Sequence, residues 1–76
     1  MNLSSDLDRN RILRIREVCE IVGLSRPTIY RYMGMNPPHF PPGIKIGISA
    51  VGWRKGAVLD YLEQREAESK QAQGLH

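Results

Sequence analysis

Two arginines five residues apart, Arg26 and Arg31, are the side chains of this sequence best suited to recognising another molecule. A guanidinium group is a planar fork of donors that matches guanine O6 and N7 or a phosphate. Ser25 and Thr28 suit a phosphate or a thymine methyl group, and Tyr30 can stack on a sugar or donate to a phosphate. This is the chemistry of binding a nucleic acid.

The residues that catalysis or metal binding would need are scarce. Cys19 is the one cysteine, so an internal disulfide is excluded and a zinc site lacks its thiolates. His39 and His76 are too few and too far apart to replace them. There is no paired carboxylate site and no phosphate-binding glycine loop. We therefore predict no catalytic residue, no metal and no cofactor.

A short helix over residues 26–33 would present the binding residues. Ser25 is a natural N-cap, because its hydroxyl can accept a hydrogen bond from a free amide of the first turn. Pro27 falls in that turn, where a missing N–H is harmless, and Gly34 should end the helix. With the apolar side facing the core, the exposed set is Ser25, Arg26, Pro27, Thr28, Tyr30 and Arg31.

Another helix is predicted just upstream, over residues 16–22. Gly23 should stop it in a left-handed conformation, which leaves only a short turn before residue 26. Two short helices joined in this way form a helix-turn-helix. The residues expected to fix the helix crossing by burial are Val18, Cys19, Val22, Leu24, Ile29 and Tyr32.

Two short β-type runs, residues 44–46 and 51–53, predict a hairpin whose tip is Gly47–Ala50. Three polar residues of this region are further candidates to contact a nucleic-acid backbone: Lys45, Ser49 and Arg54. A hairpin that only covers the core is the alternative reading of the tip.

The remaining pattern predicts a short strand at residues 11–15 and a third helix at residues 54–70. A proline-rich loop over residues 35–43 should be held by Phe40, and we assign both Phe40 and Trp53 to the core. We therefore expect a single domain over residues 9–66, between a flexible segment 1–8 and a flexible tail 67–76.

Charge is concentrated in the middle of the chain. Residues 9–55 contain nine arginines and lysines against two glutamates, although the whole chain of 76 residues has a net charge of only +3. A basic centre suits a polyanionic partner, but a solvated basic face would have the same composition. Neither a membrane-spanning run nor a signal-peptide layout is visible, so a cytoplasmic location is expected.

Three stretches together resemble the AlpA family of small phage-type transcriptional regulators: "LRIREVCEIVGLSRPTIYRYM", "FPPGIKIG" and "VGWRKGAVLDYLEQR". The resemblance covers about residues 9–65. It implies a mainly α fold with a small β-hairpin, a winged helix-turn-helix related to the MerR and excisionase DNA-binding domains. The tip differs from the family pattern, since Ile48, Ser49 and Ala50 stand where a basic residue is common.

The resemblance implies that residues of segment 25–31 face double-stranded DNA and that Lys45 with the tip forms the wing. It also implies control of an integrase gene or of prophage excision, and a homodimer or cooperative assembly on DNA is expected because one domain makes a small footprint. Two other roles stay open. One is an architectural excisionase or phage-packaging protein, and the other is a protein-interaction adaptor using the apolar face of residues 58–62.

Overall fold

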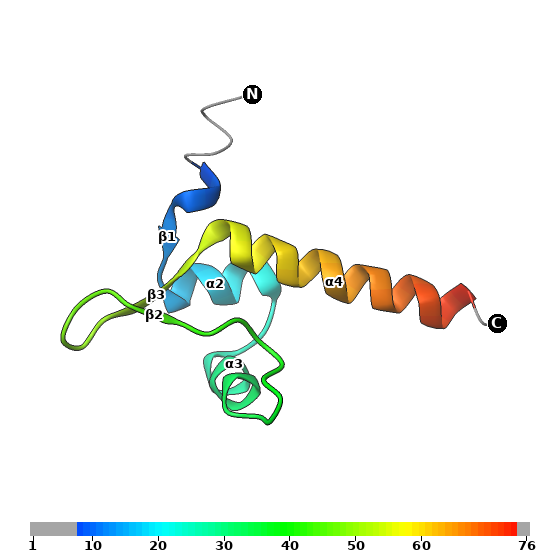
Figure 1. Ribbon diagram of the computed structural model, residues 1–76, viewed down its shortest axis with the longest axis horizontal. Helices are drawn as coiled ribbons and strands as arrows, with labels where there is room; N and C mark the ends of the chain where they lie inside the picture. The colour runs from blue at the N-terminus through cyan, green and yellow to red at the C-terminus, as the bar shows by residue number, and fades with distance from the viewer. Residues whose placement is uncertain (1–7, 75–76) are drawn as a thin grey trace.

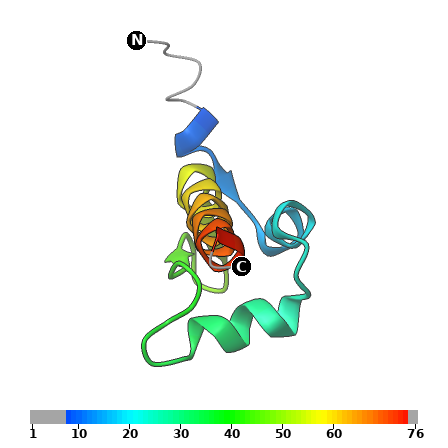
Figure 2. The same ribbon diagram turned by 90° about the vertical axis from the view of Figure 1, so that its right-hand side faces the viewer.

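The computed structural model describes residues 8–74, with side chains as far as residue 71. A single helical turn at residues 8–10 comes before six elements (Figures 1 and 2). In chain order these are β1 (Ile12–Leu13), α2 (Ile15–Val22), α3 (Arg26–Met33), β2 (Ile44–Lys45), β3 (Val51–Arg54) and α4 (Lys55–Gly74).

The helix-turn-helix forms where the sequence predicts it. Gly23 ends α2 with φ of 73°, and its amide donates to the carbonyl oxygen of Cys19 at 2.9 Å. Glycine reaches this left-handed conformation without the clash that a Cβ would bring. Only two further residues separate Gly23 from α3, so the direction of the second helix is fixed by this short turn.

Three strands form an antiparallel sheet in the order β1-β3-β2. The predicted hairpin consists of β2 and β3. The predicted upstream strand is β1, which pairs with the other edge of β3. Ile12 pairs with Arg54 and Leu13 with Trp53 on one edge of β3, while Ile44 pairs with Gly52 on the other. We refer to residues 44–54 as the wing.

The core lies where the wing, α2, α3 and the start of α4 meet. Its fully buried members are Leu13, Val18, Ile29, Phe40, Trp53 and Val58. Phe40 contacts the Trp53 ring edge-on, and the Trp53 indole Nε1 donates to the carbonyl oxygen of Pro41 at 3.1 Å. The proline-rich loop is thus held as predicted. Four residues that we expected to be buried pack against this core but are only partly buried: Cys19, Val22, Leu24 and Tyr32.

Helix α4 runs to Gly74 without a break and extends beyond the body of the molecule (Figure 1). Residues 66–71 are exposed along this extension. The described helix therefore passes the predicted domain end at residue 66, and the flexibility of the tail stays a prediction. Of the segment 1–8, the structure describes only Asp8, which makes an ion pair with Lys55 at 2.9 Å. Residues 1–7 and 75–76 lie outside the described part.

Candidate nucleic-acid interface

Helix α3 begins with a hydroxyl pair that caps its first turn. The Thr28 amide donates to Ser25 Oγ at 3.4 Å, and Ser25 Oγ–H donates to Thr28 Oγ1 at 2.8 Å. Ser25 is exposed and Thr28 is half-buried, where we had expected Thr28 to be exposed. The Thr28 hydroxyl accepts in this pair, so its own proton stays available to an acceptor outside the protein.

One face of α3 is buried and the opposite face is bare. Ile29 is the only fully buried residue of the helix, with Tyr32 and Met33 packed beside it. Four predicted site residues on the other side are exposed: Arg26, Pro27, Tyr30 and Arg31. Figure 2 shows α3 at the lower margin of the molecule, lying across the direction of α4, with no segment below it. Neither the wing nor α4 lies below the bare face in this view.

The ion pairs of the described residues divide the basic side chains into two groups. Five are held by carboxylates, in the pairs Arg9–Asp60, Arg11–Glu17, Lys55–Asp8, Arg65–Glu68 and Lys70–Glu66. The rest have no carboxylate partner within residues 8–71, and we call them the unpaired cations: Arg14, Arg16, Arg26, Arg31, Lys45 and Arg54.

All six unpaired cations come from β1, the two short helices and the wing, or from the residues beside them. The five basic residues that are held by carboxylates lie in the N-terminal turn, in its link with β1, or in α4. The positive charge that remains for a partner is therefore carried by the two short helices, the wing and the residues beside them, which favours a polyanion over the reading of a merely solvated face.

The wing brings two predicted residues to its outer part and leaves a third behind. Lys45 pairs with Val51 and is exposed, and Ser49 is exposed at the tip. Arg54 lies at the opposite end of β3, where its Nη1 donates at 3.3 Å to both the backbone and the side-chain oxygen of Asn10. This geometry separates Arg54 from the tip, so its DNA contact stays a prediction without support from its position.

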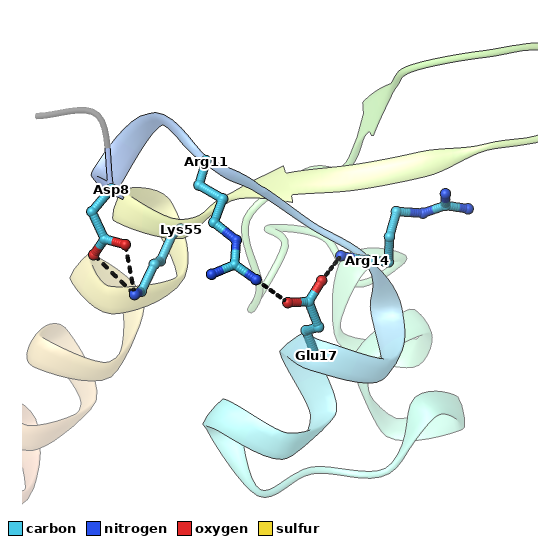
Figure 3. Close-up of polar contacts among 5 residues, drawn as sticks. All are labelled: Asp8, Arg11, Arg14, Glu17 and Lys55. Carbon is cyan, nitrogen blue, oxygen red and sulfur yellow. Dashed lines mark hydrogen bonds and ion pairs between the residues drawn. The ribbon is translucent and has the colours of Figure 1, made fainter.

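Two exposed basic residues at the start of α2 are missing from the site that we predicted. Arg14, just before α2, is exposed, and its Nε donates to the carbonyl oxygen of Val51 at 3.1 Å. Figure 3 shows its guanidinium group turned away from Glu17, which instead accepts from the Arg14 amide and from Arg11. Arg16, in the first turn of α2, is exposed as well. The excess of arginines in the middle of the chain is the sequence signal that could have pointed to Arg14 and Arg16. Their position near the wing depends on the contact between β3 and α2.

The described residues offer few groups that could bind a metal ion or catalyse a reaction. Within residues 8–71 no group of three or more histidine, cysteine, aspartate or glutamate side chains could hold a metal ion. The helices that the structure describes are also too short or too polar to cross a bilayer. Cys19 is a free, half-buried thiol of α2.

Comparison with known proteins gives a consistent result. A family profile described as "Prophage CP4-57 regulatory protein (AlpA)" matches residues 11–66. The chain is 35% identical to the uncharacterized protein ORF88 of Enterobacteria phage P4, over 86% of this chain and 72% of that protein. It is 34% identical to the DNA-binding transcriptional activator AlpA of Escherichia coli strain K12, over 72% of this chain and 84% of the relative.

No solved structure matches the chain significantly. The profile nevertheless spans both short helices, the whole wing and the packed part of α4, so it covers the elements that carry the candidate interface. With this profile match and these identities, the chain belongs to the AlpA family of phage regulatory proteins, and its fold is a winged helix-turn-helix.

Proposed function

We propose that this protein is a sequence-specific regulator that binds double-stranded DNA by placing α3 in the major groove. The observation that carries the proposal is the bare face of α3, on which Arg26 and Arg31 have no carboxylate partner. A recognition helix needs an uncovered N-terminal half with side chains that reach base edges. The relative from Escherichia coli is named as DNA-binding, which supports the same reading.

The proposed roles of the side chains follow from their chemistry. Arg26 and Arg31 contact guanine edges or phosphates, and Tyr30, which is 45% exposed, stacks on a sugar or donates to a phosphate. Ser25, Pro27 and Thr28 lie against the DNA backbone at the helix start, where the positive end of the helix dipole also favours a phosphate. Beside the Lys45–Val51 pair of the wing, Lys45 and Arg14 neutralise phosphates of the flanking backbone.

The biological setting that we propose is a prophage or phage, in the cytoplasm of a bacterial host. It is supported by the family description and by the phage origin of one relative, while the other is named as a transcriptional activator. Control of an integrase gene or of excision is the corresponding role. A domain of this size covers only about 600–1,000 Å² of DNA, so we further propose that two copies bind neighbouring half-sites.

The structure weakens one of the rivals. The adaptor reading needed the apolar side of residues 58–62 as an open contact surface, but Val58 is fully buried and Tyr61 packs against Phe40 with ring centroids 4.7 Å apart. Most of that side is therefore used inside the chain. An architectural role in excision or packaging uses the same DNA-binding surface and differs in what the bound DNA does.

The experiment that tests the proposal selects binding sites from random duplexes with the full chain, followed by gel-shift titration of the selected duplex at about 50 and 200 mM salt. We expect one sequence to be enriched and its affinity to fall steeply as salt rises. Absence of enrichment together with absence of retardation at the lower salt would refute DNA binding. Transcription in vitro from a promoter beside the selected site then separates a regulator from a purely architectural protein.

A further inference from the structure

The tip of the wing presents a single large apolar side chain to the solvent. Ile48 is 96% exposed, more than any other large hydrophobic residue among those described. The last hydrogen bond of the hairpin joins the Ile46 amide to the Ala50 carbonyl oxygen at 2.9 Å, so Ile48 stands beyond it, at the turn. Figure 1 shows this turn as the part of the wing that projects farthest from the helices. Folding gains almost nothing from an isoleucine in this position.

The shape of the tip is as unusual as its composition. Ile48 has small neighbours on both sides, Gly47 on one and Ser49 and Ala50 on the other. A Cβ added to Gly47 would already lie 3.5 Å from the Ala50 Cβ, so the two arms of the turn are close together. The result is a thin loop with one branched apolar side chain at its end.

The charges near the wing lie just behind its tip and not at the tip itself. Lys45 pairs with Val51 in the ladder, and Arg14 is hydrogen-bonded to the carbonyl oxygen of the same Val51. Both basic side chains are exposed. A wing arranged in this way can hold phosphates just behind its tip, whereas the tip itself offers no charge for a phosphate.

We propose that Ile48 is an apolar wedge that enters the DNA minor groove next to the major groove occupied by α3 and partly unstacks one base step. The inference rests on the proposed function. The minor groove is about 6 Å wide, which suits a loop of small residues. Side chains such as isoleucine are known to insert between base pairs from this groove and to kink the duplex by about 20–90°. Arg14 and Lys45 supply the complementary charge at the rims of the groove.

Insertion of Ile48 would also influence which DNA sequence the protein prefers. Unstacking costs least at flexible pyrimidine–purine steps such as TA and CA. The selected site should therefore contain such a step where the wing reaches the duplex, at a position that α3 does not touch. Replacing this step by a stiff A-tract should weaken binding of the natural protein and should matter little once Ile48 is replaced.

The test uses the full chain and a duplex of about 30 base pairs that carries the selected site, labelled at its two ends for energy transfer. A second version has 2-aminopurine at the flexible step, where loss of stacking raises the fluorescence. The proteins compared are the natural chain, Ile48→Ala and the matched control Ile21→Ala, which removes an exposed isoleucine from α2. Since Ile48 is 96% exposed, its replacement does not threaten folding.

We expect the natural chain and Ile21→Ala to shorten the end-to-end distance and to raise the 2-aminopurine signal. Ile48→Ala should lose both signals and bind about tenfold more weakly. Bending and fluorescence that are equal in all three proteins would overturn the wedge while leaving DNA binding intact. A failure of the proposed function looks different, because then the natural chain does not retard the duplex at all.

One other result would also overturn the proposal. If Ile48→Ala keeps the 2-aminopurine signal but loses cooperative binding to a duplex with two sites, then Ile48 contacts a second copy of the chain and not the DNA. Titrations on one-site and two-site duplexes, run beside the fluorescence measurement, distinguish this outcome.

Discussion

Arg14 is hydrogen-bonded to Val51, and through this contact the start of α2 is joined to the first residue of β3. The Nε donates to the Val51 carbonyl oxygen at 3.1 Å, and the guanidinium group donates to no carboxylate of the described residues. One side chain therefore connects the helix-turn-helix to the wing and also offers charge to a partner.

Replacing this arginine should affect DNA binding more than folding. We expect Arg14→Gln to lower the slope of log affinity against log salt by about 0.9, because one phosphate contact is lost. Lys70→Gln is the matched control, since Lys70 is already held by Glu66 on the exposed part of α4. Gel-shift titration across several salt concentrations measures both slopes. Equal slopes for the two variants would remove Arg14 from the interface.

The two arginines of α3 should carry sequence preference. Arg26→Ala and Arg31→Ala are each expected to weaken specific binding by about 1–3 kcal/mol, the usual range for a base-reading contact. Both side chains are exposed, so the thermal midpoint should change little. Titration against the selected duplex and against the same duplex with single base changes measures the loss. A variant that binds all duplexes as the natural chain does would show that its arginine does not read bases.

Ser25 has two roles that one pair of substitutions can separate. Ser25→Ala removes the acceptor for the Thr28 amide, and we expect it to lower the free energy of unfolding by about 1 kcal/mol. Ser25→Asp keeps an acceptor at the cap but places a negative charge where a phosphate is proposed to bind. Urea unfolding should therefore leave Ser25→Asp nearly as stable as the natural chain, while its DNA affinity falls more than that of Ser25→Ala. The reverse order of affinities would contradict a phosphate at this helix start.

Features of this fold that are set by neighbouring residues could be predicted from the sequence, whereas features set by contacts between distant segments could not. Helix α3 was predicted with its bounds, because Ser25, Pro27 and Gly34 are local signals for a beginning and an end. The buried positions of Trp53, Phe40 and Val18 followed from their size and periodicity. These features need only neighbouring residues to be understood.

Features that depend on pairing between distant segments were missed or misjudged. The strand β1 was expected, but nothing local shows that it pairs with β3 and leaves Arg54 beside Asn10. The place of Arg14 beside the wing arises from a contact across 37 positions. Exposure at the edge of a helix was also hard to judge, since Thr28 lies between the buried and the exposed side of α3.

Gly52 shows the same dependence on distant pairing and leads to the last prediction. It lies in β3, between Ile12 of one neighbouring strand and Ile46 beyond the end of the other, and a Cβ there would come within 2.5 Å of Ile12 Cγ2 and 3.1 Å of the Leu13 carbonyl oxygen. Because the obstacle includes backbone, the sheet would have to shift.

We expect Gly52→Ala to lower the free energy of unfolding by about 1–3 kcal/mol, measured by urea titration. Gly47→Ala is the control, since its Cβ would meet only the Ala50 Cβ at 3.5 Å, an ordinary contact. Equal stability of the two variants would mean that β1 does not pack against β3 as closely as described.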